Sequence, residues 1–137
     1  DELLARMKES DFTWLGANVI DTRSGKILGD MPPFVIREIG GVKIGLIGLL
    51  LPETKETSSI EDFLTVTDYC ETAKKLIPQM RAGGANTIIG LTHLFMAQDK
   101  MLAQCAPGID LILGGHEHTF KCLFIVADSV AKCHACY

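Results

Sequence analysis

Two short apolar runs on either side of a helical stretch constrain the fold of this chain more than any other feature. The first run, NTIIGLTH, ends at His93, and the second, IDLILGGHEH, begins at Ile109. The residues between them, from about 96 to 106, are predicted to form a helix, so the three segments make a strand, a crossover helix and a second strand. Strands joined in this way lie parallel in one sheet. The pattern therefore predicts an α/β fold.

Further patterns enlarge this unit. The run PFVIREIGGVKIGLIGLL holds two glycines between apolar segments, which predicts a hairpin whose second strand, residues 42–51, is central and buried. Between residues 67 and 82, Ala73, Leu76 and Met80 recur at helical steps, so we predict a helix there. We also predict a short helix over residues 1–10, a strand around residues 12–19, and a last strand in CLFIVAD.

Size and charge limit the functions open to the chain. With 137 residues and 47% hydrophobic content, one domain with a substantial core is expected. The net charge of -4, from acidic and basic residues mixed along the chain, argues against a nucleic-acid polymer surface or a polybasic membrane segment. We see no membrane segment, because no stretch approaches 18 apolar residues, and the charged first ten residues do not resemble a signal peptide, so localisation stays open.

The five cysteines are odd in number and irregularly spaced, which argues against a disulfide scaffold. Cys70 and Cys105 fall on predicted helices, where we expect buried small hydrophobic side chains. Cys133 and Cys136 have the C-x-x-C spacing of a zinc or redox pair. We favour a disordered or foreign tail at that end, since a single such pair rarely completes four zinc ligands.

Three of the four histidines are predicted to meet at one edge of the sheet. His93 ends the first strand of the parallel unit, and His116 and His118 follow the second, after two glycines. Parallel neighbours end at the same edge, and in an extended segment His116 and His118 face one side and Glu117 the other. Neutral imidazole binds zinc, manganese, iron or nickel, so we predict a metal site; Asp110 is too far along the strand to join it.

Taken singly, His93, Phe95 and Met96 also have interpretations that involve no metal or substrate. A lone histidine at a strand end, such as His93, is usually a surface or capping residue. Phe95 and Met96 follow it directly and could line a substrate cleft, although we expect core positions. The metal hypothesis therefore depends on the three histidines in combination.

The motifs GANTIIGLTHL, DKMLAQCAPGIDLILGGHEHT, GANVIDTRSGK and PFVIREIGGVKIGLIGLLLPET resemble the calcineurin-like metallophosphoesterases, in the 5'-nucleotidase branch, over about residues 3–120. The resemblance implies a four-layer αββα sandwich and two divalent metal ions, drawn from Zn, Mn, Fe, Ni and Co. It places His93 and His116 on one ion and His118 on the other. It also implies hydrolysis of phosphate esters, as in the conversion of a nucleotide to a nucleoside and phosphate.

Three motifs of that family are absent from this sequence: an Asp-x-His, a Gly-Asp whose carboxylate bridges the metals, and an Asn-His-Glu that carries the general acid. Gly29-Asp30 lies in a turn, and we interpret it as a loop. We therefore expect residues 1–127 to be the C-terminal half of a catalytic domain and residues 128–137 an atypical tail. In this interpretation the catalytic general acid lies upstream, the N-terminal half is a required partner, and the isolated chain is inactive.

A second hypothesis stays open. The chain could be a non-catalytic interaction or regulatory module that retains the fold without a complete metal centre. Asp-x-His, Gly-Asp and Asn-His-Glu motifs upstream of residue 1 would favour the enzyme, and their absence would favour the module.

Overall fold

The computed structural model describes residues 2–54, 62–118, 124–127 and 130–135. Its elements follow in chain order: α1 (Glu2–Glu9), β1 (Val19–Asp21), β2 (Lys26–Ile27), the 3₁₀ helix η1 (Leu28–Asp30), β3 (Val35–Ile39), β4 (Val42–Leu50), β5 (Leu64–Val66), α3 (Tyr69–Ala82), β6 (Thr87–His93), α4 (Met96–Cys105), β7 (Leu111–Gly114), β8 (Phe124–Ala127) and β9 (Val130–Ala135). The mixed α/β class is as predicted. None of the described helices is long and apolar enough to span a bilayer.

The main sheet has six strands in the order β3-β4-β6-β7-β9-β8, and a small second sheet has the order β2-β1-β5. β6 runs parallel to both β4 and β7, so the predicted strand-helix-strand unit is confirmed. β3 and β4 form the predicted hairpin. Gly40 and Gly41 turn it with φ of 58° and 79°, values that glycine adopts without steric cost.

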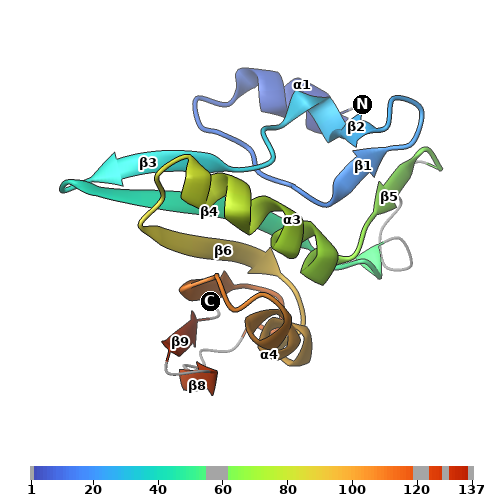
Figure 1. The fold of residues 1–137 in the computed structure, drawn as a ribbon. Helices are drawn as coiled ribbons and strands as arrows, with labels where there is room; N and C mark the ends of the chain where they lie inside the picture. Colours follow the sequence, from blue (N-terminus) through green and yellow to red (C-terminus); the bar gives the residue numbers. More distant parts are fainter. Residues whose placement is uncertain (1, 55–61, 119–123, 128–129, 136–137) are drawn as a thin grey trace.

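The core lies between the main sheet and α3, which crosses β4 and β6 in Figure 1. α3 begins where Asp68 accepts a hydrogen bond from the backbone N–H of Glu71, an N-cap. Its buried positions include Ala73, Leu76 and Met80, as the helical spacing predicts. A fully buried leucine or methionine side chain stabilises a fold by roughly 1.5–3 kcal/mol, so these contacts hold α3 on the sheet.

Cys70 and Cys105 form a disulfide, with 5.9 Å between their Cα atoms. The prediction of two separate buried thiols was therefore wrong. Cys70 lies in the first turn of α3 and Cys105 is the last residue of α4. The sequence placed both cysteines on helices, but helical patterns carry no information on which helices pack side by side.

The strand expected around residues 12–19 is shorter and later, at β1. The preceding residues cross β4 instead, where Ala17 N–H donates to the carbonyl of Gly48 over 2.9 Å. A Cβ at Gly48 would lie 2.6 Å from the carbonyl oxygen of Leu15, so the close approach of the two backbones requires glycine.

Asn18 completes the junction between the two sheets. It is fully buried, its Nδ2 donates to the carbonyls of Leu50 and Thr67, and its Oδ1 accepts from Leu50 N–H. The side chain therefore ties the start of β1 to the end of β4 and to the residue preceding the α3 cap.

The expected disordered or foreign end contains β9, which pairs parallel with β7 and antiparallel with β8. The backbone of residues 130–135 thus extends the main sheet. Cys136 lies outside the described residues, so the C-x-x-C hypothesis has no structural description. The boundary at residue 127 stays a prediction.

Candidate metal centre

The site is built where β6 and β7 end. These strands are parallel neighbours, and Thr92 pairs with Gly114 at the last step of their register. Gly115 N–H then donates to the carbonyl of Thr92 over 2.9 Å, which extends the pairing one residue past β7. His93 and His116 each follow this last pairing, so they leave the sheet at the same edge.

The two imidazole rings are in direct contact. His116 Nδ1 lies 3.1 Å from His93 Nε2, the ring centroids are 4.8 Å apart, and the rings are nearly perpendicular, at 87°. Two nitrogens bound to one ion at about 2.05 Å, and separated by this distance, would subtend roughly 100° at the ion, between octahedral and tetrahedral values. The pair therefore has the spacing of two ligands of one metal ion.

His93 is biased toward its neutral form. Burial lowers its pKa, and the nearby charges of His116 and then His118 lower it further. Neutral imidazole is the form that binds a metal ion. The electrostatics thus match the geometry of the pair.

His118 is placed differently from the prediction. The H-x-H segment is not extended: β7 ends at Gly114, residues 116 and 117 form a bend, and His118 is exposed with a φ of 50°. Its charge still lowers the pKa of His93. The described residues contain no group of three or more His, Cys, Asp or Glu side chains able to hold a metal ion. The structure thus brings two of the three predicted histidines into contact.

Glu117 is the residue that the sequence did not identify as important. Its Oε1 accepts a hydrogen bond of 2.8 Å from Met96 N–H, at the start of α4. Its Oε2 is buried and has no hydrogen-bond partner among the described residues. A buried carboxylate oxygen without a hydrogen-bond partner is costly to desolvate unless a cation or a donor pairs with it. The two imidazoles in contact fit part of the ligand set of a divalent metal ion, and the described residues add no third ligand to them.

The residues after His93 also differ from expectation in part. Met96 is buried, as predicted, but Phe95 is 43% exposed. The Phe95 ring meets the His116 ring edge to face, with centroids 4.3 Å apart. Phe95 therefore belongs to the surface of the site, because the chain turns outward between β6 and α4.

Asp110 lies outside the site, as predicted. Its Oδ2 accepts hydrogen bonds from Ile88 N–H, over 2.7 Å, and from the Arg81 guanidinium, over 2.8 Å. Arg81 also donates to the carbonyl of Gly108. This carboxylate holds the start of the two parallel strands, at the end opposite the histidines.

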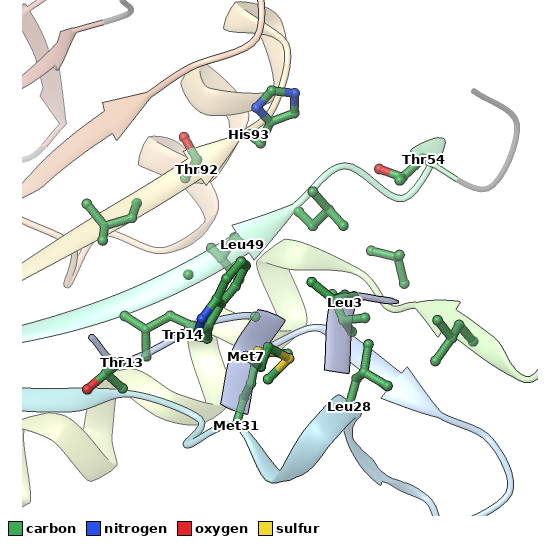
Figure 2. Close-up of a pocket in the computed structure, with 18 of the residues that line it drawn as sticks. Leu3, Met7, Thr13, Trp14, Leu28, Met31, Leu49, Thr54, Thr92 and His93 are labelled. Atoms are coloured by element: carbon green, nitrogen blue, oxygen red, sulfur yellow. The ribbon is translucent and has the colours of Figure 1, made fainter. Parts of the chain in front are cut away.

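A cavity of about 520 Å³ lies beside His93. Figure 2 shows Thr92 and His93 at one side of it and Trp14 and Met7 at the other. Its lining is largely aliphatic and aromatic.

No protein-family model matches the chain. It is 32% identical over 116 residues to a snake venom 5'-nucleotidase from Gloydius brevicauda, covering 83% of this chain and 20% of that protein. It is 32% identical over 138 residues to a 2',3'-cyclic-nucleotide 2'-phosphodiesterase/3'-nucleotidase from Yersinia enterocolitica, covering 86% of this chain and 21% of that protein.

Among solved structures, a 5'-nucleotidase precursor from Thermus thermophilus superposes with a TM-score of 0.78 at 32% identity, over 93% of this chain and 24% of that one. The chain therefore spans about a fifth of the length of the curated relatives it matches.

Proposed function

Because the chain belongs to the calcineurin-like metallophosphoesterases, in the 5'-nucleotidase branch, we propose that it is part of a metal-dependent hydrolase of phosphate esters. The observation that carries this proposal is the contact between His93 Nε2 and His116 Nδ1 at the shared end of two parallel strands. The relatives' names point to nucleotides as the substrate class, with a nucleoside and phosphate as products.

In this proposal His93 and His116 hold one divalent ion, and His118 holds its neighbour. The ions come from the set Zn, Mn, Fe, Ni and Co that imidazole ligands accept. When bound, two such ions would supply Lewis-acid polarisation of a phosphoryl group. Burial lowers the pKa of His93 and so favours its neutral, metal-binding form, and the shared strand ends fix the spacing of the pair. In this proposal the histidines are ligands and do not transfer protons.

The proposed site needs residues beyond this chain. Two imidazoles in contact and a third one exposed do not complete two metal sites, and the sequence holds none of the three acidic or amide motifs expected upstream. We therefore propose that residues 1–127 act with an N-terminal half of the same domain, which contributes the remaining ligands and the general acid. The alternative of a non-catalytic module is favoured only by the absence of a three-ligand group among the described residues.

Metal analysis and a phosphomonoester assay on a longer form and on the 137-residue form test this proposal. We expect bound metal and turnover in the longer form and no turnover in the shorter one. His116→Ala in the longer form should reduce turnover by several orders of magnitude, whereas Lys100→Ala, on the exposed side of α4, should leave it unchanged. A longer form without metal or activity would instead support the non-catalytic module.

A further inference from the structure

We propose that Glu117 is a positioning residue: its hydrogen bond to the start of α4 fixes the turn that carries His116 and thereby sets that ring for metal binding. The inference rests on the proposed metal site, and it adds a role that the histidine pair alone does not supply. It follows from how the turn after β7 is attached to the rest of the fold.

The first attachment is at the strand end, where Gly115 N–H donates to the carbonyl of Thr92. The second is the Glu117 carboxylate on Met96 N–H. His116 lies between the two attachments, so neither end of its backbone is free to rotate. With the second attachment removed, the turn would be held on one side only.

The first backbone N–H of α4 lacks an acceptor within its own helix, and the Glu117 carboxylate supplies one. The first N–H groups of a helix have no partner within the helix, and the N-cap residue here, Phe95, has no side-chain acceptor. Met96 is the first residue of α4, and Glu117 is the acceptor that its N–H reaches. The positive end of the helix also favours a carboxylate over a neutral side chain. Glu117 therefore joins two segments that the sequence separates by 21 positions.

The same region fixes the other side of the His116 ring. Phe95 meets this ring edge to face, and His93 contacts its Nδ1. Phe95 immediately precedes Met96, so the hydrogen bond from Met96 to Glu117 also holds Phe95 against His116. Both the backbone and the ring of His116 are therefore positioned through one carboxylate.

The test compares the wild type, Glu117→Ala, Glu117→Gln and Glu53→Ala, all in the longer form that includes the N-terminal half of the domain, by Co²⁺ titration, with the dissociation constant read from absorbance. Glu53 is a matched control, because its exposed carboxylate touches the first turn of α4 through Gln98. We expect Glu117→Ala to weaken Co²⁺ binding by about 10–100-fold. Glu117→Gln, whose amide oxygen can still accept from Met96 N–H, should stay within about threefold, as should Glu53→Ala.

A second readout needs no metal. In the metal-free protein, hydrogen exchange of the Met96 amide should be roughly tenfold faster in Glu117→Ala and unchanged in Glu117→Gln. Unchanged exchange in Glu117→Ala would overturn the inference. Co²⁺ binding as weak in Glu117→Gln as in Glu117→Ala would also overturn it, since charge and not the hydrogen bond would then be responsible.

Two further outcomes are separated by these readouts. If the wild-type protein binds no Co²⁺, the proposed function fails, and the inference is decided by Met96 exchange alone. If Glu117→Ala does not fold, Glu117→Asp replaces it, because a side chain one methylene shorter loses the contact with Met96. Protected Met96 in Glu117→Asp would then refute the proposed attachment.

Discussion

Replacing Asn18 with alanine should be among the most destabilising single changes in this fold. The side chain makes three hydrogen bonds to backbone groups, with lengths of 2.8, 2.9 and 2.9 Å, and it is completely buried. Two of the three involve Leu50, which is partly buried, and the third involves the carbonyl of Thr67, an exposed residue that water can reach. Alanine would leave the Leu50 N–H and carbonyl without these partners.

The size of the stability loss depends on whether water can replace Asn18 at each of its backbone partners. Each polar group left unsatisfied inside a protein costs about 1–3 kcal/mol, and a hydrogen bond that water can replace costs less. Asn18→Ala should therefore lower the free energy of unfolding by about 2–4 kcal/mol. A domain of this kind is stabilised by only about 5–15 kcal/mol in total, so the loss is a large fraction.

Urea unfolding, followed by the fluorescence of Trp14, the single tryptophan, measures this loss with the disulfide kept oxidised. The midpoint should fall by roughly 1–2 M urea. Asn86→Ala is the matched control: Asn86 is exposed and makes a single side-chain hydrogen bond, to Lys43 N–H, so we expect a loss below about 1 kcal/mol. If the two variants differed by less than about 0.5 kcal/mol, which is close to the error of such comparisons, the assigned role of Asn18 would be refuted.

Three further predictions concern other features. Reducing the Cys70–Cys105 disulfide, which spans 35 residues, should lower the free energy of unfolding by about 4 kcal/mol on the chain-entropy account; equal urea midpoints with and without reductant would contradict this. Gly48→Ala should cost about 1–3 kcal/mol in thermal unfolding because its new Cβ would meet a backbone oxygen, whereas Gly90→Ala, with its nearest contact at 3.7 Å, should cost less; equal losses would show that the backbone yields. In the metal-free chain, the pKa of His93 is lower in the folded state than in the unfolded state, so the unfolded state takes up a proton more readily. The free energy of unfolding should therefore fall as pH decreases below about 6.5. In unfolding curves recorded at several pH values, His93→Gln should flatten this dependence.

The local features of the fold could be predicted from the sequence because they depend on neighbouring residues. The β3–β4 hairpin follows from two adjacent glycines, α3 from its three- and four-residue apolar steps, and the parallel β6–β7 pair from the helix between two apolar runs. The meeting of His93 with His116 follows in turn, since parallel neighbours end at one edge.

Features that depend on contacts between distant segments could not be predicted in this way. Cys70 and Cys105 meet only because α3 and α4 cover the same sheet side by side. Glu117 accepts from Met96 N–H at the start of α4, and the segment that the H-x-H spacing alone suggested was extended is bent at this point. Neither event leaves a periodic signal in the chain.

The register between β6 and β7 makes the length of these strands a strict constraint on change. Thr92 is buried and His93 is exposed at consecutive positions of β6, because side chains alternate between the two faces of a sheet. Inserting or deleting one residue within β6 would exchange these positions, sending an imidazole into the interior and a threonine to the rim. The β3–β4 turn, where a Cβ on Gly40 or Gly41 would meet nothing within 4 Å, could instead accept extra residues without moving the histidine pair.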